Sequence, residues 1–241
     1  MKQLETKRLI LRKFKESDFA AVQSYASCPE NIIFMVWGPN SEEETKSFIR
    51  TAIAKADEVP CRNFQYAVTA KDTGKLIGAC DISISGEEGA IGWILHRDFW
   101  RQGYAAEMGA VLLDFGFGEL GLHRITATCD EENTASYKVM EKIGMRREGM
   151  FLDARPANKI SCRQYGDELS YAIVKDEWEA RKESDYYNSL PCVFNGFIEM
   201  PLLQDGEIRL VRIARVPQWH DLYTEGGYRR VNIYEWDIKH Y

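Results

Sequence analysis

Apolar and polar residues alternate along several short segments of the chain, and this period of two predicts β-strands. The clearest segment is 76–84, where Cys80 and Ile82 share one face of the predicted strand while Asp81 and Ser83 share the other. The same reasoning predicts further strands at 9–12, 64–70, 91–95, 124–129, 145–152 and 162–174, and turns at 71–74, 86–89 and 154–159.

Apolar residues at helical spacing, together with end signals, predict the helices. Ser41 and Glu44 form a capping box, with acidic residues in the first turn that favour a helix beginning there. The predicted helices cover residues 18–28, 41–56, 104–117, 134–144 and 176–182. Antiparallel strands that lead into a strand–loop–helix unit predict a mixed α/β domain, in which the strand at 124–129 runs parallel to the one before it.

The C-terminal part of the chain has a different composition. Residues 184–188 are polar and are predicted to be a linker, and alternating runs at 207–211 and 231–234 predict strands beyond it. We therefore expect one domain over 1–183 and a small β-rich extension over 184–241. The extension is either a non-catalytic appendage or the start of a second module. Because about fifty residues form a marginal core, it should dock on the main domain or on another subunit, and a homodimer through it is expected.

Composition narrows the class of protein. The 241 residues are 45% hydrophobic and 28% charged, with a formal net charge of −6, which argues against a nucleic-acid-binding surface. No apolar run is long enough to span a membrane, and the first residues resemble no signal peptide, so a cytoplasmic protein without membrane contact is expected. Six widely spaced cysteines and four scattered histidines predict reduced thiols and no metal site.

The candidate chemistry lies at the predicted strand–loop–helix unit, residues 93–107. The loop ends at Gly103, and the small side chains of Ala105 and Ala106 leave the first helical turn accessible. The N–H groups of a first turn have no partner within the helix, so this site suits a phosphate or pyrophosphate. An ordinary turn is the alternative, and neither a Walker loop nor a complete GxGxxG fingerprint is present.

The residues from Trp100 to Glu107 resemble the acetyl-CoA pyrophosphate loop of the GNAT N-acetyltransferases, and most closely that of the RimJ/RimL-type branch. That branch often shows W-G-x-G-Y-A-x-E, from which this sequence departs at Arg101, a change that is tolerable if the residue keeps a negative φ. Other landmarks follow in family order over about residues 4–180, at 6–12, 123–125, 133–136, 141–145, 148–149, 167 and 171.

The resemblance implies the GNAT fold, a mostly antiparallel sheet with one splayed parallel pair of strands flanked by helices. It also implies transfer of an acetyl group from acetyl-CoA to an amine, either a protein N-terminal α-amine or a small molecule, by direct attack in a ternary complex. Ser136 would be the catalytic residue, hydrogen bonded to the sulfur. The implied contacts of acetyl-CoA are Ile94, Leu95, His96, Arg101, Gln102, Gly103, Tyr104, Ala105, Ala106, Asn133, Ser136 and Tyr137.

The acceptor side is less well marked. Candidate substrate contacts are Phe34, Trp37, Asp81 and Glu88. The tyrosine that many family members use as an acid falls at Met140, and the usual acidic residue of the central strand falls at Ala90. Deprotonation of the amine through water is therefore the default expectation. A catalytically weak or inactive module that binds acyl-CoA as a sensor or scaffold remains the alternative, and nucleotide binding without CoA is a third.

Overall fold

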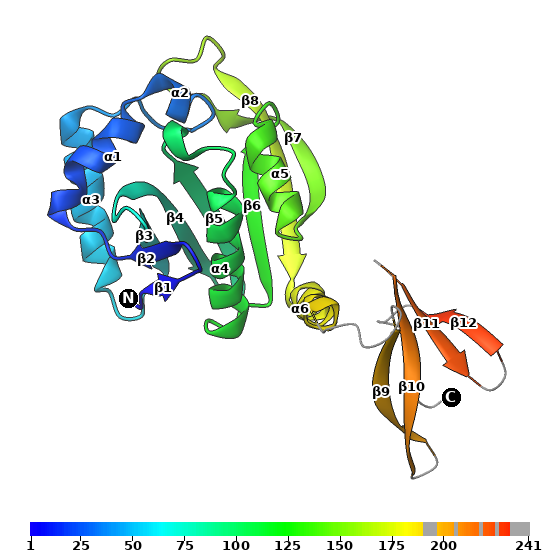
Figure 1. The fold of residues 1–241 in the computed structure, drawn as a ribbon. Coiled ribbons are helices and arrows are strands. Elements are labelled where there is room, and N and C mark those ends of the chain that lie inside the picture. Colours follow the sequence, from blue (N-terminus) through cyan, green and yellow to red (C-terminus); the bar gives the residue numbers. More distant parts are fainter. Residues whose placement is uncertain (190–196, 205–206, 217–218, 225–226, 232–241) are drawn as a thin grey trace. The chain divides into compact units, whose positions relative to one another are not determined.

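A computed structural model describes residues 1–189, 197–204, 207–216, 219–224 and 227–231 (Figure 1). The chain divides into two compact units, Met1–Trp178 and Glu179–Tyr241, which are considered separately.

The first unit is built on one eight-stranded sheet. Its strands are β1 (Leu4–Glu5), β2 (Leu9–Arg12), β3 (Asn63–Ala70), β4 (Leu76–Ser85), β5 (Glu88–Leu95), β6 (Arg124–Asp130), β7 (Arg146–Pro156) and β8 (Tyr165–Val174). Their order is β1-β2-β3-β4-β5-β6-β8-β7, and every neighbouring pair is antiparallel except β5 and β6. The mostly antiparallel sheet with one parallel pair, predicted from the sequence, is confirmed.

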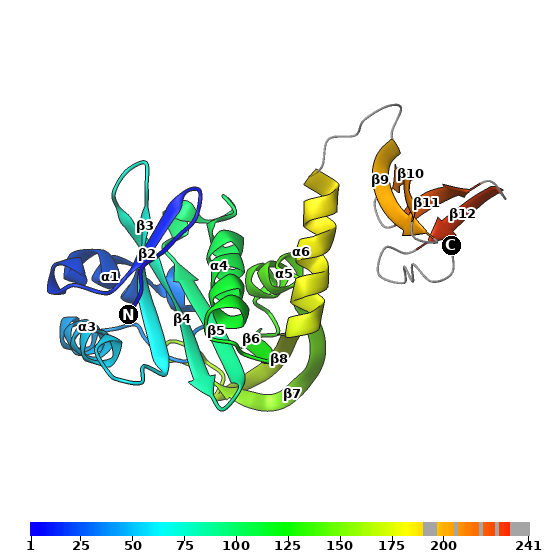
Figure 2. The same ribbon diagram turned by 90° about the horizontal axis from the view of Figure 1, so that it is seen from below.

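Helices cover both faces of this sheet. They are η1 (Glu16–Asp18), α1 (Phe19–Ala26), α2 (Pro29–Ile32), α3 (Glu42–Ala56), η2 (Arg97–Phe99), α4 (Tyr104–Gly118), α5 (Thr134–Lys142) and α6 (Lys175–Ser189). Helices α1 and α3 run side by side, as do α4 and α5 (Figures 1 and 2). The predicted capping box begins α3, with Ser41 and Glu44 each bonding the other's backbone N–H.

Alternation along the central strands separates two hydrophobic cores. Tyr66 and Cys80 belong to the core that α4 covers, whereas Ala67 and Ala79, one position along each strand, belong to the core beneath α1 and α3. Since successive side chains point to opposite faces of a sheet, α4 lies on one face and α1 and α3 lie on the other. Both faces of β4 are therefore covered, which leaves the polar Asp81 between sheet and helices.

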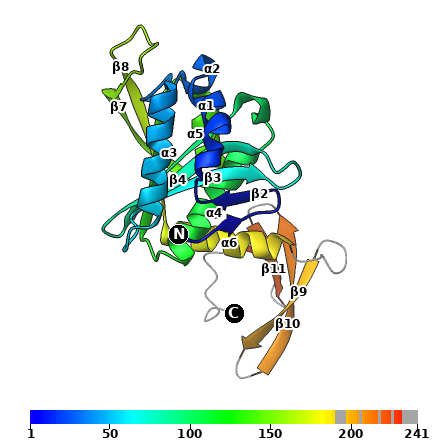
Figure 3. The same ribbon diagram turned by 90° about the vertical axis from the view of Figure 1, so that its left-hand side faces the viewer.

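The long hairpin of β7 and β8 reaches back to the segment that follows α2 (Figure 3). Arg155 bonds the Phe34 carbonyl at 3.2 Å, and Asn158 bonds the Ile32 carbonyl at 2.6 Å. The strand β7 includes 154–156, which the sequence predicted as part of a turn. The predicted turn was too long because Ala154 and Arg155 have strand geometry despite the proline that follows.

Two further predictions were wrong at element boundaries. Helix α6 continues to Ser189, through the polar residues 184–188 predicted to be a linker, because polar composition alone does not distinguish a solvated helix from a loop. The short helix α2 was also missed, since Pro29 was taken as the end of α1 although proline is well accommodated at a first helical position.

In the second unit the described strands form one antiparallel sheet. They are β9 (Phe197–Gln204), β10 (Glu207–Val216), β11 (Trp219–Thr224) and β12 (Gly227–Val231), in the order β12-β11-β10-β9. The strand predicted at 207–211 is confirmed within β10. Of the one predicted at 231–234, only Val231 is described, and residues 232–234 lie outside the described residues.

Candidate active site

The predicted phosphate loop joins β5 to α4 through the short helix η2. Arg101 has φ of 59° and Gly103 has φ of 81°, and α4 begins at Tyr104. The condition for a tolerable departure from glycine, a negative φ at Arg101, is therefore not met. It occupies a left-handed position where related loops carry glycine, and a residue with a side chain is rarely found there. The loop holds a strained backbone conformation of the kind that concentrates at ligand-binding sites.

The first N–H groups of α4 are left without partners. Glu107 N–H donates to the Gly103 carbonyl at 3.1 Å, which starts the helical ladder. Within the described residues, no acceptor is found for the N–H groups of 101–106. Unpaired donors at the positive end of a fifteen-residue helix are the arrangement that favours an anionic ligand.

Arg8, just before β2, holds this loop from behind, a role that the sequence analysis missed. Its guanidinium donates to the Gln102 carbonyl at 2.9 Å and to Glu107 at 2.6 Å, and it stacks over the Tyr104 ring at 4.3 Å. The Thr6 hydroxyl also bonds the Glu107 carboxylate. Glu107 was noted only as part of a motif, and Arg8 only as part of the opening strand, because nothing in the sequence spacing indicates that these two residues meet.

Beyond the loop, β5 and β6 separate. They pair in parallel only over three positions, from Glu88 with Arg124 to Ala90 with Thr126, although β5 continues to Leu95 and β6 to Asp130. The open edges beyond Ala90 provide backbone groups on either side of a gap. This is the splayed pair that the sequence analysis expected.

The register of β5 indicates which of its residues face that gap. His96 N–H donates to the Ile77 carbonyl at 2.8 Å, so His96 and, by alternation, Ile94 direct their backbone groups to β4. Trp93 and Leu95 face the other way, and the Leu95 carbonyl already accepts from the side chains of Asn31 and Trp100, at 2.7 Å each. Of Ile94, Leu95 and His96, the three strand residues predicted to contact acetyl-CoA, only Leu95 therefore has a backbone N–H that faces the gap. Trp93, which was not predicted, faces it as well.

Asn133 and Ser136 lie together at the start of α5. The Asn133 side chain accepts from Ser136 N–H at 3.1 Å, as a capping residue does. Burial raises the pKa of the Cys129 thiol on the neighbouring strand β6 to about 11, against a smaller lowering by the charge of Arg155. Tyr137 is half-buried against the main core.

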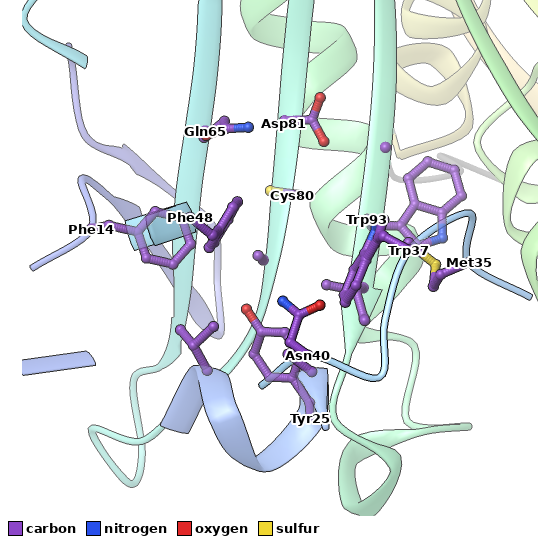
Figure 4. A pocket seen from close by; sticks show the side chains of 15 residues that line it. Phe14, Tyr25, Met35, Trp37, Asn40, Phe48, Gln65, Cys80, Asp81 and Trp93 are labelled. Atoms are coloured by element: carbon purple, nitrogen blue, oxygen red, sulfur yellow. The ribbon is translucent and has the colours of Figure 1, made fainter. Parts of the chain in front are cut away.

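A cavity of about 470 Å³ lies on the face of the sheet that α1 and α3 cover (Figure 4). Asp81 and Gln65 come from neighbouring strands, while Tyr25 comes from α1 and Asn40 from the segment before α3 (Figure 4). The lining residues are Phe14, Val22, Tyr25, Ala26, Met35, Trp37, Asn40, Phe48, Gln65, Ala79, Cys80, Asp81, Gly92, Trp93 and Ile94.

Asp81 is the only ionised carboxylate among these lining residues. Burial raises its pKa from 3.8 to about 6, with no charged partner contributing. Gly92 lies opposite it on β5, and a Cβ there would come within 3.1 Å of the Asp81 Oδ1. The glycine therefore provides the space into which the carboxylate leans. At neutral pH this carboxylate is mostly ionised, yet it retains enough basicity to accept a proton.

Two lining side chains carry buried polar atoms without partners. Neither the Gln65 Oε1 nor the Tyr25 hydroxyl has a hydrogen-bond partner within the described residues. Buried polar atoms are normally paired, and these two, which have almost no accessible surface, are enclosed beside the cavity and do not open into it. Gln65 could have been noticed from the sequence as a polar residue within an apolar strand. Tyr25 was noted only as part of an amphipathic helix.

The structure brings some of the predicted acceptor contacts together and not others. Trp37 and Asp81 both line the cavity. Phe34 and Glu88 do not: the Phe34 carbonyl bonds Arg155, and Glu88 is exposed at the start of β5, at the opposite end of the strand from the phosphate loop. Glu88 was predicted because it lies two residues from Ala90, the position at which related enzymes carry an acidic residue. The sequence does not indicate that this end of β5 lies away from the phosphate loop.

Comparison with protein families identifies the chain. A model described as "Acetyltransferase (GNAT) domain" matches residues 8–146, which is more than half of the sequence. The chain belongs to the GNAT acetyltransferases. An uncharacterised N-acetyltransferase of Bacillus subtilis, YnaD, is 37% identical over 177 residues, covering 73% of this chain and 98% of its own. This acetyltransferase is of the RimJ/RimL type, as the loop suggested.

Solved structures agree with this assignment. A GNAT acetyltransferase from Bacillus anthracis is 35% identical, with a TM-score of 0.63, and covers 73% of this chain and 99% of its own. Mycobacterium smegmatis RimJ in complex with CoA-disulfide shares the fold at 22% identity, with a TM-score of 0.61 over 70% of this chain and 83% of its own. Membership of the family implies that this acetyltransferase uses acetyl-CoA.

Positions 140 and 90, where the resemblance implies a tyrosine and an acidic residue, carry Met140 and Ala90 in this chain. Met140 is only 1% exposed and belongs to the main core, and Ala90 is exposed but has no titratable group. Among the described residues, no three His, Cys, Asp or Glu side chains gather as they would around a metal ion. The same part of the chain contains no helix with the length and apolar character needed to cross a membrane.

Proposed function

We propose that this acetyltransferase transfers the acetyl group of acetyl-CoA directly to an amine held in the cavity, with Asp81 as the proton acceptor. The observation that supports it most is the set of unpaired N–H groups at 101–106, beside the gap between β5 and β6. Acetyl-CoA supplies the acetyl group as an activated thioester when it is bound.

The residues that would hold acetyl-CoA fall into three groups. The N–H groups of the loop from Arg101 to Ala106 bind the diphosphate, and Arg8 keeps the loop in shape through the Gln102 carbonyl. Trp93 and Leu95 N–H groups, on the open edge of β5, pair with the amides of the pantetheine arm as a neighbouring strand would. Asn133 and Tyr137 bind the arm from α5. The RimJ structure, bound to CoA-disulfide, is consistent with such a site.

The reacting amine must be neutral when it attacks. Asp81, with a pKa of about 6, accepts the ammonium proton directly or through one water molecule. Asp81 thereby provides the group that Ala90 cannot. The Ser136 hydroxyl donates a hydrogen bond to the departing sulfur from the start of α5, where Asn133 caps the helix. Trp93 lines the cavity for the amine, and its backbone faces the gap for the pantetheine arm, so it lies between the two binding regions.

The experiment compares two substitutions of left-handed glycines in the full-length chain. Gly103→Ala places a methyl group at φ of 81° in the loop, and Gly74→Ala does the same at φ of 66° in the β3–β4 turn, where nothing lies within 4 Å. Both cost about 1 kcal/mol of backbone strain. We expect only Gly103→Ala to weaken acetyl-CoA binding, by about tenfold in calorimetry, and to slow thiol release with an accepted amine.

Equal acetyl-CoA affinity in the two variants would overturn the assignment of the loop. A second candidate, a module that binds acyl-CoA without turnover, is favoured by Met140 and Ala90 in place of acidic groups. It predicts tight binding to the wild-type protein and no thiol release with any amine, in contrast to the transferase.

A further inference from the structure

The charge of the cavity restricts what it can hold. Asp81 is its one ionised carboxylate, and among the lining residues that the structure describes there is no lysine, arginine or histidine. A ligand with one positive charge would therefore be neutralised by Asp81. A second positive charge, or a carboxylate on the ligand, would enter a poorly solvated space without a partner, which is strongly unfavourable.

The walls of the cavity indicate the body of that ligand. Aromatic rings of Phe14 and Phe48 meet edge to face at 5.3 Å, and Trp37 and Trp93 also line the space. Such walls bind compact aromatic or branched apolar groups, and their ring faces also attract a cation. A volume of about 470 Å³ is in the range of small-molecule pockets, and is too small for several residues of a peptide.

The polar atoms of the cavity place the amine at one end. Gln65 and Asp81 are directly paired across β3 and β4, so their side chains lie next to each other on this face of the sheet. The Gln65 Oε1 and the hydroxyl of Tyr25, on the helix that covers the cavity, are enclosed beside the cavity without partners. The charged acceptor that the cavity offers to an ammonium group is therefore the Asp81 carboxylate.

Resting on the proposed function, we infer that the acceptor is a compact primary amine that carries one positive charge, an aromatic or branched apolar body, and no carboxylate. Asp81 binds its ammonium group, and the aromatic walls enclose the body. The site selects such amines against amino acids, polyamines and protein N-termini. In the reaction one ammonium proton passes through Asp81 to water, and the neutral nitrogen forms a bond to the acetyl carbonyl carbon. The carbon–sulfur bond then breaks, and the departing thiolate takes up the second proton that the nitrogen loses.

The test uses the full-length protein and four probe amines of stated chemistry. Phenethylamine has the inferred features, L-phenylalanine adds a carboxylate to the same body, L-phenylalaninamide adds a neutral group of the same size, and spermidine adds charge without the body. We expect kcat/KM for thiol release to be about a hundredfold higher with phenethylamine than with L-phenylalanine or spermidine. L-Phenylalaninamide should fall between them, since it adds bulk without charge.

Binding without acetyl-CoA gives an independent measurement. We expect phenethylamine to quench tryptophan fluorescence of the wild-type protein, and Asp81→Asn to weaken this binding at least tenfold. Asp72→Asn, which removes an exposed carboxylate in the β3–β4 turn, is the matched control and should leave it unchanged. The Gln65→Leu variant should weaken binding less than Asp81→Asn, because it leaves the charge of Asp81 in place.

Turnover of an alanine-initiated hexapeptide in preference to all four probes would overturn this inference while leaving the acetyltransferase proposal intact, as would equal use of L-phenylalanine and phenethylamine. Absence of thiol release with every amine, despite acetyl-CoA binding, would instead count against the transferase. In that case phenethylamine binding that depends on Asp81 would still support the ligand class, and its absence would refute it.

Discussion

The half-buried Asp81 carboxylate should make the protein less stable at neutral pH than it would be with a neutral side chain. Its pKa rises from 3.8 to about 6 on folding because of burial alone. A tenfold change in acidity is worth about 1.4 kcal/mol, so ionising this group in the folded protein costs about 3 kcal/mol above pH 6. Water that enters the cavity reduces this cost, and we expect a value of about 1–3 kcal/mol.

The direction of the pH dependence follows from proton binding. Between pH 4 and 6 the folded protein binds the Asp81 proton and the unfolded chain releases it, so this group lowers the free energy of unfolding as the pH rises. Asn has the shape of the protonated acid and no charge. Asp81→Asn should therefore stabilise the protein at pH 8 and have almost no effect at pH 4.

Thermal unfolding followed by circular dichroism at pH 4, 6 and 8 measures the effect. At about 2–4 °C per kcal/mol for a domain of this size, the melting temperature at pH 8 should rise by about 2–12 °C. Asp72→Asn, at an exposed position, should leave it unchanged at each pH. A gain in Tm that is the same at pH 4 and 8, or a loss of stability at pH 8, would refute the reasoning, because neither can come from relief of a buried charge.

Three further predictions concern the reaction. The kcat/KM should fall about tenfold per pH unit below about pH 6 as Asp81 is protonated. Initial rates with two amines of different basicity should show this decline at the same pH, and a decline whose pH changes with the amine would assign it to the substrate. Arg8→Lys should raise the KM for acetyl-CoA about three- to tenfold with little change in kcat, since lysine cannot bond both Glu107 and the Gln102 carbonyl. Arg50→Lys, on the exposed side of α3, should change neither constant. A KM unchanged by Arg8→Lys would show that the loop keeps its conformation without Arg8. Met140→Tyr should lower Tm through about 1–3 kcal/mol of overpacking and should not increase kcat, because position 140 lies in the core; a rise in kcat would mean that the ring reaches the sulfur.

Local patterns predicted the elements and the phosphate loop because the physics of these features is local. Alternation, capping residues and a glycine before a helix act within a few positions of the chain, and the loop from Arg101 to Ala106 was found with its unpaired N–H groups. The φ of Arg101 could not be obtained in this way for the complementary reason. Its left-handed conformation accompanies a contact with the residue just before β2, where Arg8 bonds the neighbouring Gln102 carbonyl from 94 positions away.

The acceptor side could not be predicted in the same way because burial is a property of the assembled fold. Asp81 alternates with apolar residues along β4, which by itself is the pattern of a solvated strand face. Only the packing of α1 and α3, from the first sixty residues, covers that face and removes the carboxylate from water. The raised pKa, the space beside Gly92 and the unpaired Gln65 all arise from that one packing event. A carboxylate at an alternating strand position therefore becomes a candidate base when helices from elsewhere in the chain cover its face, and residue spacing along the strand does not reveal this.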